Sequence, residues 1–301
     1  MAVSWLHRLA TLAAPTVYPC EGPYMLAATE HLFLSGAVRR ALRPRSAAIL
    51  LVAGDIPSCA AQAVDRLHDQ LPHPRATYLW DGTSDPAAAL TECWRKIVGG
   101  SDEADRLPDE PPKPWRGEGD HGQGGKGMMG GTPYGRPMAM TGEDVRDGLM
   151  LDRYTATIGP FAPMLPPGLA LEVTLQGDVI VATEVQAPPF EQLPEASAPE
   201  ACAARLLRLL GQDGDADRLL RGRKPHGVLH FAAIPAGLGC VAEGDDVRVR
   251  LRAWLAGQPG TYQAPRLPDL LMGAEWHEAM LILASFPPDA LRRACLAEEA
   301  A

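Results

Sequence analysis

The chain has 301 residues, 46% of them hydrophobic and 22% charged, so it can bury a sizeable core in one large or two modest domains, and we favour two. Its net charge is −9, and no stripe of Lys and Arg with interleaved aromatic residues occurs, which argues against nucleic-acid binding. No window reaches the roughly 18 uninterrupted apolar residues of a membrane span, so we expect a chain that is soluble or peripheral to a membrane.

Residues 3–14 predict an amphipathic helix, because Val3, Leu6, Leu9 and Leu12 fall on one helical face. A secretory signal is the rival interpretation. The positive charges lie inside the apolar stretch and no small-residue cleavage site follows, which argues against that rival. We expect the helix to pack on its domain, and contact with a bilayer remains an alternative.

Residues 1–100 predict an α/β domain with a small parallel sheet. Ala47–Gly54 is a continuous apolar run, as in a buried parallel strand, and Ala76–Trp80 is the next expected strand. Helix-forming residues fill Pro57–Gln70 between these strands and Ala87–Val98 after them. Strand, helix and strand in this order make a βαβ unit.

Residues 101–148 predict a flexible linker, because the segment is dense in Pro, Gly and charge and has too little apolar surface to offset the entropy of ordering. It could instead be a soft-metal tract for copper(I), with imidazole and thioether ligands. The candidate ligands are His121, Met128, Met129, Met138 and Met140. One imidazole and scattered thioethers fix no geometry, so a tether, or a segment that folds along a partner surface, is preferred.

Residues 149–301 predict an α+β domain made of a β-hairpin and helices. The strand-like runs Leu169–Leu175 and Val179–Val185 flank a Gly-containing turn and alternate apolar with polar residues. A Pro-rich break at 188–199 ends this hairpin. The expected helices are Glu200–Leu210, Asp215–Arg221, Asp246–Leu255 and Ala274–Ser285.

The cysteines indicate small buried hydrophobic residues in a reducing, cytoplasmic compartment. They are widely spread and form no Cys-x-x-Cys or Cys-His pattern, which argues against a zinc site or a ferredoxin-type cluster. The six are Cys20, Cys59, Cys93, Cys202, Cys240 and Cys295.

No catalytic motif occurs in the chain. The Gly-rich stretch of the linker lacks the flanking strand and helix of a phosphate loop, and neither Gly-x-Ser-x-Gly nor His-Glu-x-x-His is present. Glu275, His277 and Glu278 could form a carboxylate pair or metal site, but acidic residues also suit a helix start, which we favour. His226 and His230 share a face of an expected strand and supply only two ligands. We assign no catalytic, cofactor-binding or metal-binding residue.

Residues 45–75 contain an apolar strand ending in Val52–Asp55, a helix, and the run Asp-Gln-Leu-Pro-His-Pro-Arg at 69–75. This arrangement resembles the small, cluster-carrying subunit shared by respiratory complex I and the nickel–iron hydrogenases. In that family a Gly-rich segment with a cluster cysteine follows the next strand. Here Trp80–Ser84 has no cysteine, and only Cys20 lies near the N-terminal ligand position. A [4Fe–4S] cluster needs four thiolates, so the resemblance implies the scaffold without its cluster.

Ile158–Gly168 leads into a hairpin whose Leu175–Val179 turn reads Leu-Gln-Gly-Asp-Val. This stretch resembles the start of the large partner subunit, the 49-kDa-type or hydrogenase large chain. In that family the segment opens with Gly-Pro-x-His-Pro, and the histidine helps to line the quinone site of complex I. Ala162 stands there in this chain, and the nickel-binding Cys-x-x-Cys pairs are missing. Proton delivery to a quinone would lack its donor.

Together the two resemblances imply a fusion of shortened relatives of neighbouring subunits. The expected function is a non-redox structural or coupling subunit on the cytoplasmic face of a complex I-like or hydrogenase-like ion-translocating membrane assembly. Its expected partners are membrane-embedded antiporter-like subunits and other peripheral-arm subunits, and no cofactor is expected. One alternative is a quinone- or hydrogenase-type electron-transfer subunit, in which Cys20, Cys59 and Cys93 would have to converge. The other is soft-metal binding by the linker.

Overall fold

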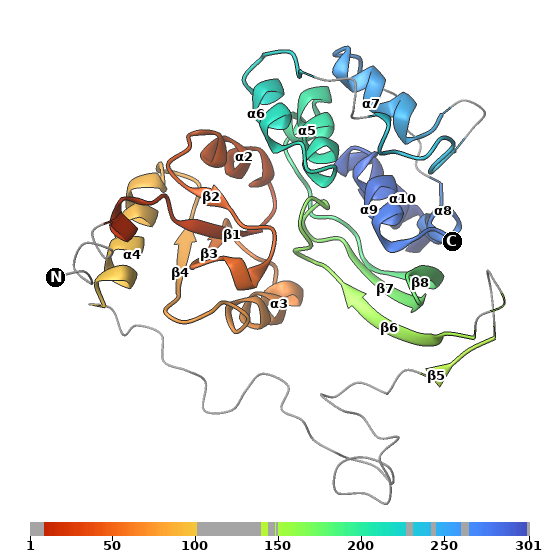
Figure 1. Ribbon diagram of the computed structural model, residues 1–301, viewed down its shortest axis with the longest axis horizontal. Coiled ribbons are helices and arrows are strands. Elements are labelled where there is room, and N and C mark those ends of the chain that lie inside the picture. Colours follow the sequence, from red (N-terminus) through yellow and green to blue (C-terminus); the bar gives the residue numbers. More distant parts are fainter. Residues whose placement is uncertain are drawn as a thin grey trace, which may run out of the picture.

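The computed structural model describes residues 9–100, 140–143, 148, 150–226, 231–241, 245–259 and 265–299. Figure 1 shows an N-terminal half, residues 9–100, beside a C-terminal half, residues 140–299. Residues 101–139, most of the predicted linker, lie outside this description, while residues 9–12 of the predicted N-terminal helix are helical. In the part of the chain that is described, no helix combines the length and the apolar character that crossing a membrane requires.

The N-terminal half is an α/β unit around a parallel sheet with the strand order β2-β1-β3-β4. Its elements are β1 (Thr16–Glu21), α2 (Leu26–Leu34), β2 (Arg39–Arg40), β3 (Ile49–Ala53), α3 (Ser58–His68), β4 (Ala76–Trp80) and α4 (Ala87–Gly99). The predicted parallel sheet is confirmed, and its β3-α3-β4-α4 run matches the expected elements. The β1-α2-β2 unit was not predicted.

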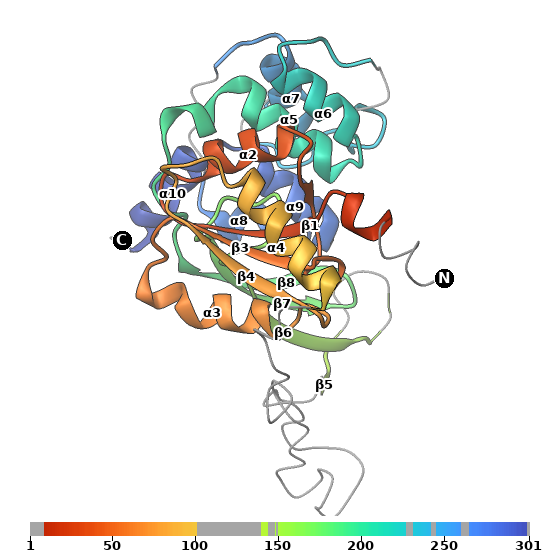
Figure 2. The same ribbon diagram turned by 90° about the vertical axis from the view of Figure 1, so that its left-hand side faces the viewer.

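Both faces of the parallel sheet are buried, because its central strands alternate between two apolar clusters. Ile49 and Leu51 of β3 face the cluster that includes residues of α2 and α4. Leu50 and Val52 face the cluster that includes residues of α3. Figure 2 shows α4 in front of the sheet. All of β3 is therefore buried, which explains its uninterrupted apolar sequence.

The C-terminal half combines an antiparallel sheet with helices. Its elements are β5 (Met140–Thr141), β6 (Asp152–Ile158), β7 (Ala170–Gln176), β8 (Val179–Ala187), α5 (Pro199–Leu209), α6 (Asp213–Leu220), α7 (Val247–Leu255), α8 (Leu267–Leu271), α9 (Trp276–Ala284) and α10 (Pro288–Glu299). The predicted hairpin is β7-β8, with Gly177 at φ +64° in its turn. Strand β6 and helices α8 and α10 were not predicted.

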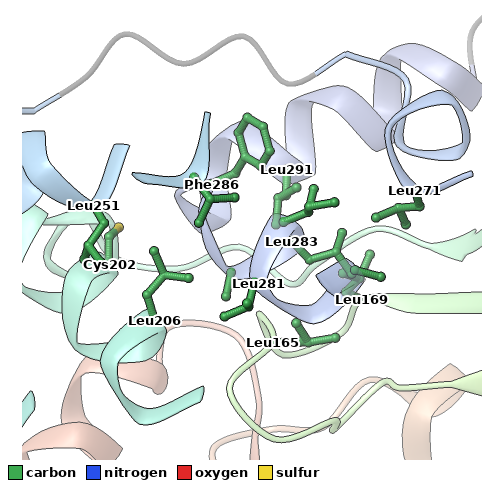
Figure 3. Packing of buried hydrophobic residues seen from close by; sticks show 14 of the residues in the cluster. Leu165, Leu169, Cys202, Leu206, Leu251, Leu271, Leu281, Leu283, Phe286 and Leu291 are labelled. Carbon is green, nitrogen blue, oxygen red and sulfur yellow. The ribbon is translucent and has the colours of Figure 1, made fainter. Parts of the chain in front are cut away.

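The core of the C-terminal half lies between this sheet and the helices. Figure 3 shows side chains from α5, α7, α9 and α10 packing with Leu165 and Leu169, which lie in the loop before β7. The residues labelled there are Leu165, Leu169, Cys202, Leu206, Leu251, Leu271, Leu281, Leu283, Phe286 and Leu291. Cys202 is fully buried among them, as expected of a cysteine used as a small hydrophobic residue.

Candidate functional site

The two halves meet where Phe161, in the loop between β6 and β7, packs against residues of β1, β3 and α3. Tyr18 of β1 donates a buried hydrogen bond of 2.7 Å to the Phe161 carbonyl oxygen, and Phe161 shares a buried cluster with Val52. Gly159 permits the course of this loop, since its φ is +101° and a Cβ there would lie 2.0 Å from the Leu169 carbonyl oxygen. The contact between the halves is therefore continuous with the core.

Buried charges span the same contact, and we call them the junction cluster: Glu21, Glu30 and Arg40 from the N-terminal half, with Arg205 and Arg208 from α5. The Glu30 carboxylate pairs with Arg40 of its own half and accepts a 3.1 Å hydrogen bond from Arg208 of the other. Burial alone raises the pKa of Glu30, but Arg40 and Arg208 outweigh it and hold the pKa below its usual value. Ionised Glu30 therefore ties α2 to α5.

Glu21, at the end of β1, is the poorly paired carboxyl of the junction cluster. It is 8% exposed, and its Oε1 lies 3.8 Å from Nη1 of Arg40, too far for a hydrogen bond. No protein group donates a hydrogen bond to this Oε1. Burial raises the pKa of Glu21 to about 7; nearby Arg40 lowers the pKa and Glu30 raises it further. This carboxyl therefore exchanges its proton near neutral pH.

A small cavity, which we call the junction cavity, lies beside Glu21 and has a volume of about 20 Å³. Its N-terminal wall includes Tyr18, Glu21 and Arg40, and its C-terminal wall includes Ala162. Ala162 therefore lies at the contact between the halves. The remaining lining residues are Pro19, Ala41, Phe161, Pro163, Met164, Leu165 and Pro167.

The carboxyl ends of β1 and β3 form the topological switch point of the parallel sheet, where α/β folds usually bind ligands. Here the side chain of Met25 covers the glycines that follow β3 and β4. A Cβ on Gly54 would lie 2.6 Å from Met25 Cγ, and one on Gly82 would lie 3.1 Å from Met25 Sδ. The chain itself therefore fills the floor of this crevice.

The C-terminal half closes the same crevice with residues 191 and 192. Gln192 Oε1 accepts a hydrogen bond of 3.1 Å from the Leu26 N–H at the start of α2, and Gln192 Nε2 donates to the Gly22 carbonyl oxygen at 3.3 Å. Tyr24 donates its backbone N–H and its hydroxyl to Glu191. Gln192 thus occupies the helix N-terminus where an anion would bind in a nucleotide-binding fold.

The three cysteines that an iron–sulfur alternative would require are not brought together. Cys20 is fully buried in the cluster on the α3 face, whereas Cys93 packs against the cluster on the α2 and α4 face. Cys59 is exposed at the start of α3. Burial raises the pKa of the Cys20 thiol, which disfavours the thiolate that a metal needs. The described residues contain no group of three or more His, Cys, Asp or Glu side chains suited to a metal ion.

The other titratable groups singled out in the sequence have structural roles. Glu275 is the N-cap of α9, and its N–H donates to the Glu278 carboxylate at 3.1 Å, which confirms the helix-start interpretation. His226 lies outside any strand, which corrects the prediction at this residue, while residues 227–230 of that expected strand lie outside the described residues; His226 Nδ1 lies 3.0 Å from Asp215 Oδ1. His230 lies outside the described residues, as do His121, Met128, Met129 and Met138.

The sequence contained little signal for this junction. The segment 188–199 reads as a Pro-rich break, yet it carries the two residues that close the crevice. The charges that the two halves contribute to the junction cluster are far apart in the sequence, and each resembles an ordinary surface residue. Among the residues at the junction, the sequence analysis singled out Ala162. It gave no indication of the buried charges around that residue.

Removing the Tyr18 hydroxyl tests the contact between the halves. We expect Tyr18→Phe to lower the free energy of unfolding by about 1–2 kcal/mol, because the buried Phe161 carbonyl oxygen loses its donor. Tyr78→Phe is the control, since no hydrogen bond of the Tyr78 hydroxyl is found in the described structure. Urea unfolding measures both variants, and equal stabilities would contradict the role assigned to Tyr18.

Comparison of the chain with protein-family models, with curated proteins and with solved structures finds no match.

Proposed function

We propose that this chain is a non-redox structural or coupling subunit of a complex I-like or hydrogenase-like ion-translocating membrane assembly. In this proposal it docks at the cytoplasmic face against membrane-embedded, antiporter-like subunits and other peripheral-arm subunits. The proposal combines the two sequence resemblances with the geometry of the junction between the halves.

The closed crevice at the carboxyl ends of β1 and β3 is the observation that carries the non-redox part of the proposal. A ligand-binding α/β protein keeps this place open for its cofactor or substrate. Met25 packs over Gly54 and Gly82, and Gln192 satisfies the free N–H of Leu26. Opening the crevice would leave Leu26 N–H and the Gly22 carbonyl without these partners. A packing role fits this arrangement better than turnover does.

The contact between the two halves supports the proposed role as a coupling subunit. The resembled subunits are neighbours in one assembly, and here their counterparts share a buried charge cluster and an apolar contact through Phe161. Ala162 lines the cavity between them without an imidazole. In this proposal the chain keeps the packing surfaces of the resembled subunits. Trp80–Ser84 has no cluster cysteine, and Ala162 stands where those subunits have the quinone-site histidine.

Affinity purification of the full tagged chain from detergent-solubilised membranes of its native host tests this function. We expect multi-spanning subunits to co-purify in fixed stoichiometry, and the preparation to lack iron–sulfur absorbance when it is handled anaerobically. The triple variant Cys20→Ala, Cys59→Ala and Cys93→Ala should retain the same partners, because the proposal gives these thiols no redox role. A chain recovered without membrane subunits would overturn the docking role, and stoichiometric iron lost in the triple variant would overturn the non-redox role.

A further inference from the structure

Four buried polar atoms of the junction cluster lack hydrogen-bond partners within the described structure: Oε1 of Glu21 and Nε of Arg40, Arg205 and Arg208. Two of them, the acceptor Oε1 of Glu21 and the donor Nε of Arg40, belong to residues that line the junction cavity. Buried groups of this kind nearly always have a partner, because leaving one unsatisfied is costly. Both residues line the junction cavity, which therefore lies beside these two side chains.

The junction cavity has the size for one water molecule. Its volume is about 20 Å³, and roughly 10–15 Å³ measured in this way is enough to hold a water. A buried water needs 2–4 polar partners. Glu21 Oε1 can accept from it and Arg40 Nε–H can donate to it. The Tyr18 hydroxyl also belongs to the lining, and after donating to Phe161 it keeps a lone pair for a third bond.

We infer that the junction cavity holds one ordered water molecule that bridges Glu21 and Arg40, making Glu21 a hydrated proton-binding site at the contact between the halves. The site does not depend on whether the chain docks to a membrane assembly. It goes beyond the proposed function, which assigns no role to Glu21.

The charges that face Glu21 determine how this site binds its proton. Arg40 of β2 and Arg205 of α5 lower the pKa of Glu21, and Glu30 of α2 raises it, while burial is the largest influence and also raises it. A water that donates to Oε1 stabilises the ionised carboxylate. Displacing this water therefore raises the pKa of Glu21 further. Both halves contribute to the site, because Arg205 and Ala162 belong to the C-terminal half.

Filling the cavity tests the inference. Ala162→Val adds two methyl groups to the C-terminal wall of the cavity, while Ala182→Val, on an exposed position of β8, is the matched control. The carbon-13 shift of the Glu21 side-chain carboxyl, followed against pH, measures its proton affinity. We expect an upward shift of about 1 pH unit in Ala162→Val and none in Ala182→Val.

A high-resolution crystal structure of the unaltered full chain provides a second measurement that does not depend on a variant. We expect one water within hydrogen-bond distance of both Glu21 Oε1 and Arg40 Nε. A dry cavity, or Glu21 Oε1 bonded directly to a protein donor, would overturn the inference. So would a Glu21 titration that is the same in Ala162→Val as in the unaltered chain.

Discussion

Replacing Glu30 with Gln is expected to lower the free energy of unfolding by about 3–5 kcal/mol, the usual cost of breaking a buried ion pair from one side. Glu30 is the carboxylate shared by Arg40 and Arg208, and the Arg40, Glu30 and Arg208 side chains are 10%, 12% and 7% exposed. Glutamine keeps the shape of the side chain but leaves the two guanidinium groups without that negative charge between them. Because Arg208 belongs to the other half, the loss also weakens the contact between α2 and α5.

Glu92→Gln provides the matched control for this prediction. Glu92 pairs with Arg95 on α4, but those side chains are 56% and 58% exposed, so the same chemical change should cost less than about 0.5 kcal/mol. Chemical denaturation near neutral pH measures both variants. The loss in Glu30→Gln should shrink as the pH falls below the ordinary glutamate pKa of 4.5, because the depressed pKa of Glu30 stabilises the fold only where the carboxyl is ionised. Similar losses in the two variants would contradict the bridging role of Glu30.

The elements that the sequence predicted well are those whose local pattern agrees with their burial. Strand β3 lies between two apolar clusters, so its residues Ile49–Ala53 form an uninterrupted apolar run. The β7-β8 hairpin combines alternating residues with Gly177 in the αL conformation of its turn. In both cases a short segment contains the whole signal, and no distant contact is needed to recognise it.

Strand β1 was not predicted because Pro19 lies in it, and proline usually argues against an interior strand. The structure explains the exception. The Val17 carbonyl accepts from Ala41 N–H on the β2 side of β1, so Pro19, two residues later, also faces that side. Strand β2 contains only Arg39 and Arg40 and has ended by this point. The missing N–H of Pro19 therefore removes no ladder hydrogen bond.

The junction could not be predicted because its members become neighbours only through the tertiary fold. Glu30 of α2 and Arg208 of α5 lie 178 positions apart in sequence. In the sequence, each looks like an ordinary charged helix residue that faces solvent. The halves also meet where Phe161 joins the apolar cluster of β1 and β3, in a loop whose course the Gly159 backbone permits. No local pattern encodes that chain of contacts.

Glu21→Gln is expected to stabilise the fold at neutral and alkaline pH while leaving it nearly unchanged in acid. The folded-state pKa of Glu21 is about 7, against 4.5 for an unperturbed glutamate. Between these values the folded state binds more protons than the unfolded state, so this group makes stability fall as the pH rises. One pKa unit corresponds to about 1.4 kcal/mol, and the shift therefore costs the unaltered chain up to about 3 kcal/mol above pH 7.

Urea unfolding at a series of pH values from about 3.5 to about 8 measures this effect, with Glu184→Gln on the exposed face of β8 as the control. At the acid end Glu21 is protonated, and glutamine resembles it in shape and charge, so the two stabilities should nearly coincide. As the pH rises, Glu21→Gln should become the more stable protein, and the difference should level off above the folded-state pKa. Glu184→Gln should show no such trend. A difference between Glu21→Gln and the unaltered chain that is constant with pH would mean that Glu21 is already ionised in acid, and that Arg40 and Arg205 stabilise its charge more strongly than burial opposes it.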